Sequence, residues 1–597
     1  MPHPPVYVVD AAVQPGPLRT RALPGAPLVP LRAMMHGTAR RLIEATPELV
    51  DAIDGIHVGT MGVMQSMADD RLHVSHLGHD LRRTLGLRNV TAPLADGDEA
   101  VHTEIATSDA GAAIFQRAVR HVRAGRHRTV LVVAGEQMHG TGTVSEAARR
   151  DLAARAVADV LRGGRTTGRL AEEIRATVRT RVAAALATHA EADALDPRRL
   201  GLDDATLAAL AEFARRDADR DDLQRAIRSV VAPTDSVVDG FTMLHVGDLL
   251  MDALVRSSDV SDGDWRAALA TATLRKYAWG HRFAAAFQSG VEVRRGLVTE
   301  ADLAAERHVT PWFTKHDVGA PCNGATAIVL TSDADLARRL AHRWPQACRL
   351  RVDGLGEGHA PLAVSDRGDS NGLIGAMRTA LAQALGAAGA DPRSFVGETS
   401  DGIGVLHDAF PSIELSFLGL LQRAVRPDAP TSDVIRAAGL DWLRGRSNPL
   451  GGLCAAGHAV GNSGLLQIAK VHFAATRRSD CVAFGDDAPT ANRWLATSVG
   501  AAVTNVRATV LTVTDADNPE PARRPTTCAI PPLFDAVRPG PISGTRVAGH
   551  PVQLSMDAAG LRLEAVEAPS RDRNINVLPE WSEAIERVRE SLPERSA

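Results

Sequence analysis

The sequence predicts an α/β fold, and three features of the 597-residue chain lead to this prediction. An amphipathic stretch at 111–124 is followed by the apolar run TVLVVA at 129–134, the pattern of a strand–helix–strand unit whose strand is covered on both faces. A second apolar run, ATAIVLT, occupies 325–331. A Gly-rich stretch at 448–464 leads directly into an apolar helical pattern at 465–475. These features indicate two α/β halves.

Shorter patterns complete the expected order of elements. Strands are expected at 7–10, 56–59, 102–107 and 481–485, and helices at 38–45, 74–85 and 580–591. Residues 145–230 are rich in Ala, Arg, Asp and Glu at helical spacing, which predicts a helical insertion with charged faces turned to solvent or to a partner. Residues 236–310 are also helical in pattern. The proline-rich last 80 or so residues predict a small segment of short strands that ends in a helix.

Composition narrows the class of protein. Hydrophobic residues make up 45% and charged residues 23% of the chain, and the net charge is −4, so nothing favours nucleic acid or an anionic membrane as partner. The five cysteines form no Cys-x-x-Cys pair, which argues against a disulfide framework or a Cys-rich zinc site and favours a reducing cytoplasm. The N-terminus does not resemble a signal peptide, and no apolar run is long enough to predict a membrane span.

Ser108 lies at the turn between the expected strand at 102–107 and the helix at 111–124. Unpaired backbone N–H groups and the positive end of the helix dipole stabilise an anion at such a place, which suits a nucleophile. On local evidence alone, the interpretation of Ser108 as an ordinary helix N-cap is favoured, because serines that start helices are common.

The Gly-rich stretch at 448–464, NPLGGLCAAGHAVGNSG, frames His458 just before a helix. It resembles the thiolase signature, in which Gly-Gly is followed by Gly-His-Pro and a Gly-x-Ser-Gly helix start. Other pieces resemble thiolase motifs in the same order along residues 5–515. They are the nucleophile helix and Gly-x-Glu-x-Met turn at 109–138, DGFT at 239–242, AAFQSG at 285–290, PCNGATAIVL at 321–330 and HDAF at 407–410. The His-Asp form of the last motif is closest to sterol-carrier-protein-type thiolases.

The resemblance implies a duplicated five-layer αβαβα fold, with a mixed five-stranded sheet in each half and the site where two buried helix N-termini meet. It places the thiolase nucleophile at Ser108, the activating histidine at His458, an oxyanion contact at His407 and, with a weaker match, the second cysteine of a Cys-x-Gly strand end at Cys481. Backbone groups of Gly457 and Ala483 are expected at the oxyanion. The substrate would be a coenzyme A thioester, with no tightly bound cofactor.

Three positions depart from the family pattern. Ser108 replaces a cysteine, Ala459 replaces the proline after the histidine, and Cys481 lacks the glycine two residues later. A serine hydroxyl needs a base within hydrogen-bond reach, and an acyl-serine ester accepts a carbanion poorly. The sequence therefore favours simple acyl transfer from acyl-CoA or an acyl-carrier thioester through acyl-Ser108. A non-catalytic thiolase-like subunit and a Claisen-condensing enzyme that uses serine are the alternatives.

The expected domains follow from the same patterns. Residues 1–145 and 311–345 form the first half, 146–310 a loop domain with its insertion at about 146–235, 346–515 the second half and 516–597 a C-terminal extension. The resemblance implies a homodimer or higher oligomer, and the insertion or extension is a candidate for binding a partner protein. His73, His76 and His79 recur every third residue, but no carboxylate or cysteine completes a ligand set, so no metal is expected.

Overall fold

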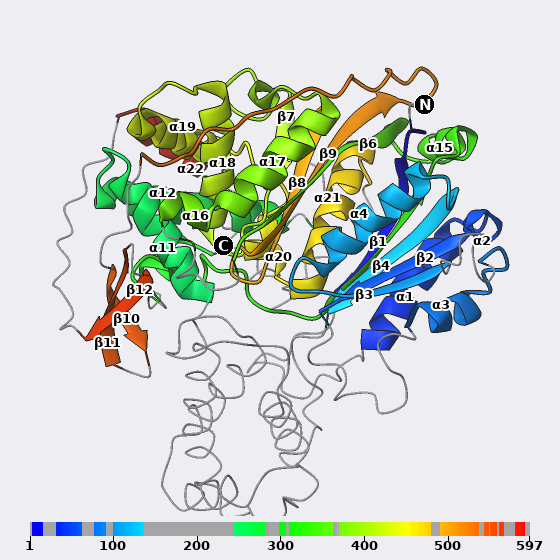
Figure 1. Ribbon diagram of the computed structural model, residues 1–597, viewed down its shortest axis with the longest axis horizontal. Helices are drawn as coiled ribbons and strands as arrows, with labels where there is room; N and C mark the ends of the chain where they lie inside the picture. Colours follow the sequence, from blue (N-terminus) through cyan, green and yellow to red (C-terminus); the bar gives the residue numbers. More distant parts are fainter. Residues whose placement is uncertain are drawn as a thin grey trace, which may run out of the picture.

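One large mixed sheet with helices on its faces forms the centre of the computed structural model (Figure 1). The structure describes residues 3–15, 31–61, 77–90, 100–136, 243–281, 283, 298–305, 308, 310–361, 367, 369–478, 490–535, 542–547, 550–557, 560–565 and 579–591. The α/β class predicted from the sequence is confirmed.

Nine strands make up this sheet, in the order β3-β2-β4-β5-β1-β6-β9-β8-β7. Their bounds are β1 Tyr7–Pro15, β2 Gly55–Thr60, β3 Val101–Ile105, β4 Thr129–Glu136, β5 Gly324–Thr331, β6 Cys348–His359, β7 Gly402–Val405, β8 Arg493–Gly500 and β9 Asn505–Asp515. Instead of two separate five-stranded sheets, the two halves share one sheet, because β1 and β6 pair through Tyr7 with Arg351 and Val8 with Leu350.

The pairing pattern of the first half recurs in the second. β1 runs antiparallel to β5, β5 antiparallel to β4, and β4 parallel to β2. In the same way β6 runs antiparallel to β9, β9 antiparallel to β8, and β8 parallel to β7. The parallel pair β2–β3 has its counterpart in a single parallel bridge between Gly404 and Ser447. The second half therefore has four described strands, with a fifth reduced to one bridge.

Three hydrophobic cores lie between the sheet and the helices that cover it. Along β4, Val130 and Val132 enter a core with helices α4 (Ala110–Arg123) and α21 (Ser463–Thr476), whereas Leu131 and Val133 enter a core with α1 (Leu31–Ala45). The third core lies on the far side of the second half and involves α17 (Gly375–Ala388), α18 (Pro411–Val425) and α19 (Thr431–Leu443). Helices α4 and α21 are thus buried between the two halves.

The remaining helices lie around this centre. They are α2 Leu49–Ala52, α3 Leu77–Leu85, α11 Met243–Arg256, α12 Asp262–His281, α14 Glu300–Ala305, α15 Ala334–Ala341, α16 Ser370–Leu373, α20 Gly452–Ala456 and α22 Pro579–Ser591, with two short 3-10 helices at Pro392–Ser394 and Val460–Asn462. The expected helical insertion at about 146–235 and the segment at 285–290 fall outside the described residues.

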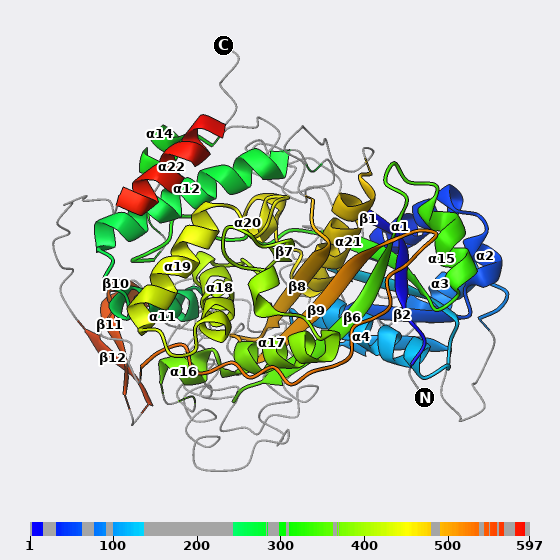
Figure 2. The same ribbon diagram turned by 90° about the horizontal axis from the view of Figure 1, so that it is seen from above.

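The last part of the chain has both features expected from its sequence. A small antiparallel sheet contains β10 Ile542–Val547, β11 His550–Asp557 and β12 Gly560–Ala565. The final helix α22 returns to lie beside α12, as seen from above in Figure 2. Its Trp581 is fully buried and meets Trp265 of α12 edge to face, with ring centroids 4.9 Å apart. This helix is therefore part of the main body.

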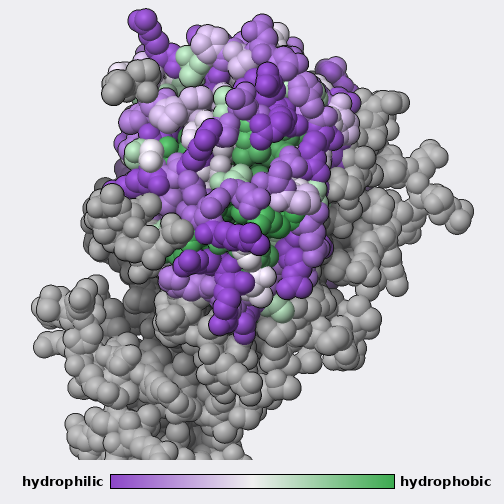
Figure 3. Space-filling model, turned by 90° about the vertical axis from the view of Figure 1, so that its right-hand side faces the viewer, coloured by the Kyte–Doolittle hydropathy of each residue, from purple (hydrophilic) through white to green (hydrophobic). Residues whose placement is uncertain are grey.

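The described part of the surface exposes few large hydrophobic side chains. The face on the α2 and α3 side is largely hydrophilic, with small hydrophobic areas between polar residues (Figure 3). Among the described residues, Met243 is the large hydrophobic side chain that stands out as exposed, at 37%. None of the described helices is long and apolar enough to cross a membrane.

Candidate functional site

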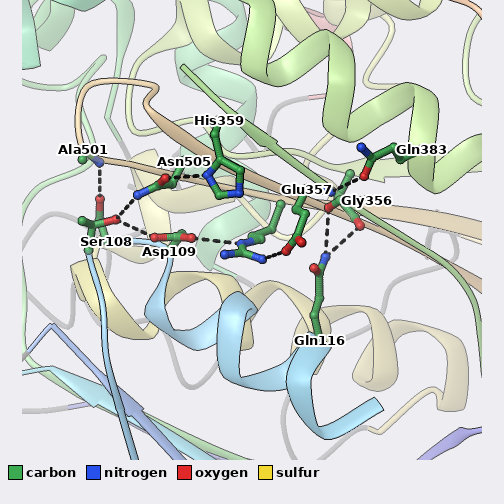
Figure 4. Close-up of polar contacts among 12 residues, drawn as sticks. Ser108, Asp109, Gln116, Gly356, Glu357, His359, Gln383, Ala501 and Asn505 are labelled. Atoms are coloured by element: carbon green, nitrogen blue, oxygen red, sulfur yellow. Dashed lines mark hydrogen bonds and ion pairs between the residues drawn. The ribbon is translucent and has the colours of Figure 1, made fainter. Parts of the chain in front are cut away.

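Ser108 lies in the turn that joins β3 to α4. Helix α4 begins at Ala110, and its N-cap residue is Asp109, so the interpretation of Ser108 as the cap is wrong. The Ser108 hydroxyl oxygen accepts a hydrogen bond from the backbone N–H of Ala501, 3.3 Å away, in the turn between β8 and β9 (Figure 4). The hydroxyl is therefore not used to close the helix, and it faces the second half of the molecule.

The turn before α4 is held to the second half by side chains from both. Thr107 Oγ1 donates to Asp109 at 2.5 Å and accepts from Asn505 Nδ2 at 3.3 Å. The Arg507 guanidinium donates to Asp109 at 3.2 Å and also pairs with Glu357 (Figure 4). These contacts fix the backbone on both sides of Ser108.

The first turns of α4 and α21 meet closely. A Cβ atom on Gly111 would lie 2.9 Å from the backbone nitrogen of Leu465 and 3.0 Å from the carbonyl oxygen of Gly461. A Cβ atom on Gly464 would lie 2.6 Å from the Cβ atom of Ala112. Glycine is required at both positions, because any side chain would push the helices apart. The positive ends of the two helix dipoles thus converge, the arrangement that the thiolase resemblance implies.

His458 precedes α21 and is held at both its backbone and its ring. Its N–H donates to the Ala320 carbonyl at 2.9 Å, and its carbonyl accepts from Cys322 N–H at 3.1 Å. Its ring atom Nδ1 lies 2.7 Å from Ser463 Oγ. This hydrogen bond fixes the direction of the imidazole and leaves Nε2 for a ligand or a proton. The neighbouring Gly457 N–H, expected to face an oxyanion, instead donates to Leu453 O at 2.9 Å.

His407 follows β7 and lies beside His458. The centroids of the two imidazoles are 5.2 Å apart and their planes are inclined by 80°. The His407 backbone N–H donates to Thr497 Oγ1 of β8 at 2.9 Å, while its ring atom Nδ1 is buried without a hydrogen-bond partner. The structure thus brings together the two histidines that the sequence singled out.

Burial keeps both imidazoles neutral. It lowers the pKa of His458 to about 4, and it lowers the pKa of His407 well below its ordinary value, with the charge of His458 as a smaller cause. At neutral pH each ring therefore carries one N–H donor and one free lone pair. No hydrogen bond joins Ser108 to either histidine among the described residues.

The two histidine segments are anchored to one buried lysine. Lys276 Nζ of α12 lies 2.9 Å from Asp408 and 2.5 Å from Glu414. Asp408, next to His407, accepts from Leu453 N–H at 2.6 Å, and Glu414 accepts from Asn448 Nδ2 at 2.8 Å. Burial alone would lower the pKa of Lys276, but the two carboxylates raise it above its usual value. Lys276 therefore stays protonated, and its contacts tie the segment after His407 to the loop that carries His458.

Ser498, near the end of β8, is a site residue that the sequence did not reveal. Its hydroxyl is buried without a hydrogen-bond partner, 2.8 Å from where a Cβ atom on Gly464 would lie. Ser498, Val499 and Gly500 form a Ser-x-Gly strand end, and a Cβ atom on Gly500 would lie 2.4 Å from Thr107 Oγ1. A search for serine as well as cysteine in the expected Cys-x-Gly pattern would have found it. Cys481 and Ala483 lie outside the described residues.

The turn after Ser498 is strained. Ala501, Ala502 and Val503 have φ angles of 46°, 56° and 65°, in the left-handed region that non-glycine residues disfavour. Arg367 supports this turn by donating to the Ala502 carbonyl at 2.6 Å. Strain of this kind persists where the surroundings enforce it and is frequent at functional sites. Here it aims the Ala501 N–H at Ser108.

Comparison with known proteins gives a structural likeness only. No protein-family model matches the chain, and no curated protein matches it. Human mitochondrial 3-ketoacyl-CoA thiolase is similar to 86% of this chain over 99% of its own length, at 14% identity and a TM-score of 0.46. The same human enzyme in complex with CoA is similar over 98% of its length, at 14% identity and a TM-score of 0.47. This similarity assigns no activity to the present chain.

Proposed function

We propose that this protein is an acyltransferase that takes an acyl group from acyl-CoA or an acyl-carrier thioester onto Ser108. The observation that carries the proposal is the position of the Ser108 hydroxyl. It does not cap α4, and it precedes the helix start that meets the N-terminus of α21. His458 is hydrogen-bonded to Ser463 at that same end of α21, and the neutral His407 lies beside it. A developing oxyanion is stabilised by such dipoles and N–H donors.

In the first step the Ser108 oxygen bonds to the thioester carbonyl carbon, and the carbon–sulfur bond breaks. The serine proton passes to His458 Nε2 and then to the leaving thiolate, which departs as a thiol. A base with a pKa of about 4 accepts a proton less readily than one near 7, so stabilisation of the oxyanion must supply much of the rate. In the second step an acceptor nucleophile attacks the ester and releases Ser108.

Two hydroxyl groups favour transfer over Claisen condensation. Ser108 occupies the position expected for the nucleophile, and the buried hydroxyl of Ser498 lies near the end of β8, close to Gly464 of α21. A thiol with a pKa near 8.5 supplies some thiolate at neutral pH, whereas a serine hydroxyl does not. A Claisen-condensing enzyme is the weaker alternative for this reason. Product analysis with acetyl-CoA as the sole substrate distinguishes the two, since condensation yields acetoacetyl-CoA.

The test is intact-mass spectrometry after incubation with acyl-CoA donors of increasing chain length. We expect the mass of one acyl group on the wild type and on Ser498→Ala, and none on Ser108→Ala. Ser498→Ala is the matched control, because it removes a second buried hydroxyl from the same site. An adduct that persists in Ser108→Ala, or no adduct with any donor, contradicts the proposal.

One observation favours a second candidate, a non-catalytic subunit that binds an acyl ligand. Ser108 Oγ has its hydrogen bond from Ala501 and none to a histidine. If the protein is such a non-catalytic subunit, acyl-CoA should raise the melting temperature of wild type and Ser108→Ala equally, and no covalent adduct should form. The homodimer expected from the resemblance and the cytoplasmic location favoured by the cysteine pattern belong with the acyltransferase proposal.

A further inference from the structure

Four histidines from separate parts of the first half gather at the end of α4 remote from Ser108. His57 lies on β2, His102 on β3, His121 on α4 and His127 just before β4. His57 and His102 are direct partners in the parallel β2–β3 pair. One ring nitrogen from each of the four lies within 4.8 Å of the others. The ring centroid of His57 lies 4.6 Å from that of His102 and 5.0 Å from that of His121.

This cluster contains nitrogen atoms that the protein itself leaves unpaired. His57 is fully buried, and neither of its ring nitrogens has a hydrogen-bond partner. The Nδ1 atom of His121 is also buried without one, on a side chain that is 9% exposed. Buried polar groups are nearly always paired, so each exception needs an explanation. A bound cation that accepts several of these nitrogen lone pairs would provide that explanation.

We propose that His57, His102, His121 and His127 bind one divalent transition-metal ion, with Zn²⁺ as the expected occupant. Imidazole nitrogen suits Zn²⁺ and its first-row neighbours, whereas Mg²⁺ and Ca²⁺ require oxygen ligands. Tetrahedral Zn–N bonds of about 2.1 Å place the four nitrogens roughly 3.4 Å apart. The four nitrogens lie within 4.8 Å of one another, so binding would draw the most distant pair together by about 1.4 Å.

The surroundings of the cluster fit a bound cation. Asp54 lies 3.9 Å from His127 Nδ1, and its carboxylate accepts from the backbone N–H groups of Arg128 and Thr129 at 2.8 and 3.0 Å. At 3.9 Å the Asp54 carboxylate is not a hydrogen-bond partner of the ring, but its negative charge favours a cation at the cluster. Gly55 makes room for the His127 ring, because a Cβ atom there would lie 2.9 Å from the ring.

Burial and the neighbouring positive charges disfavour protonation of these imidazoles, so their nitrogen lone pairs remain available to a metal ion. Burial lowers the pKa of His57 well below its ordinary value and that of His121 to about 4, and the neighbouring histidines add to both shifts. Arg117 and Arg126 contribute positive charge, and Arg117 is paired with Glu104 at 3.6 Å. Neutral imidazoles are the form that binds metal. A bound cation would pair the buried nitrogen lone pairs of His57 and His121.

The site has a structural role. His121 is 13 residues beyond Ser108, which is about 20 Å along a helix, so the ion does not contact the acyl group. Four protein ligands leave no open position for a substrate, as in structural zinc sites. The ion would join β2, β3, α4 and the start of β4, which together position Ser108. This inference does not depend on the proposed acyl transfer.

The test uses the full-length protein after removal of metal with a chelator. We expect Co²⁺ to bind one ion per chain with the intense visible bands of tetrahedral coordination, and Zn²⁺ to abolish those bands. Zn²⁺ should raise the melting temperature of the metal-free protein by several degrees. His121→Gln and His102→Gln should lose both responses while melting close to the metal-free wild type.

The control variants are His79→Gln, from the repeating histidines of the sequence, and His342→Gln, a half-exposed histidine paired with Asp517. Both should bind Co²⁺ like the wild type. The proposal is overturned if the wild type takes up no stoichiometric metal, because the four rings are then simply packed together. It is also overturned if His121→Gln and His102→Gln retain the Co²⁺ spectrum, because the ion then binds elsewhere.

Discussion

Ser463 fixes the orientation of the His458 imidazole and thereby determines which ring nitrogen is free. Its hydroxyl lies 2.7 Å from His458 Nδ1, so the outward nitrogen of the ring is Nε2. The residue is fully buried at the first position of α21, where alanine also fits. The sequence presented this serine only as part of a helix start, because its contact with the ring depends on the turn between positions 458 and 463.

Ser463→Ala should slow acylation of Ser108 by roughly tenfold, which corresponds to about 1.4 kcal/mol for one lost hydrogen bond. Thermal stability should change little. Single-turnover mass spectrometry measures the rate. Ser416→Ala is the matched control, because Ser416 is equally buried and bonds only within α18. Equal rates in Ser463→Ala and wild type would show that the ring needs no such support.

Helices α4 and α21 define the site because they meet at two glycines. Gly111 and Gly464 each face the opposite helix at distances that exclude a side chain. The Gly-rich sequence at 448–464 predicted a close approach to a ligand, and the structure shows that part of it serves helix–helix packing instead. Sequence patterns reveal that glycine is required, but not which partner requires it.

Gly111→Ala and Gly464→Ala should each lower the free energy of unfolding by about 1–3 kcal/mol, the usual cost of overpacking, and should abolish acylation. Gly375→Ala at the start of α17 is the control, since a Cβ atom there meets nothing within 4 Å. Denaturant unfolding measures all three. A stable Gly111→Ala variant with unchanged acylation would mean that the helix contact does not position Ser108.

The triad of Lys276, Asp408 and Glu414 joins α12 to the histidine segments, and it should be sensitive to loss of the lysine. Lys276→Met removes the cation that contacts both buried carboxylates, so the free energy of unfolding should fall by about 3–5 kcal/mol. Arg256→Met removes the half-exposed ion pair with Asp252 on α11 and should cost less than about 1 kcal/mol. Similar small losses in both variants would mean that the triad is not an anchor.

At the scale of the whole molecule, local patterns and long-range contacts were predictable to different degrees. The apolar run at 129–134 became β4, the pattern at 465–475 became α21, and the last predicted helix is α22, because each signal lies within one element. The joining of the halves through β1 and β6 depends on strand register, which no local pattern specifies. The histidine cluster was also missed, because its residues lie at positions 57, 102, 121 and 127 and only the fold brings them together.

Buried neutral histidines should make the fold sensitive to acid. The pKa of His458 is about 4 in the folded state and near 6.5 when unfolded, so below pH 6.5 the unfolded chain binds a proton that the folded chain rejects. The free energy of unfolding should therefore fall as pH drops from 6.5 towards 4, by about 1.4 kcal/mol per pH unit for this residue.

Denaturant unfolding of the metal-free protein across this range measures the effect. His458→Gln should have a shallower decline than wild type by that amount. Comparing variants separates His458 from Asp10 and Asp441, whose pKa values burial raises and which act in the opposite direction. Identical pH dependence in His458→Gln and wild type would show that this histidine is not held neutral.

The location of the acyl group after one turnover is the most direct test of acyl transfer through Ser108. The protein would be mixed with a slight excess of acyl-CoA, quenched in acid, digested and sequenced by tandem mass spectrometry. We expect the acyl group on the Oγ of Ser108, with one equivalent of free CoA released. An acyl group on Cys481 or Ser498, or CoA release without an acylated residue, would contradict transfer through Ser108.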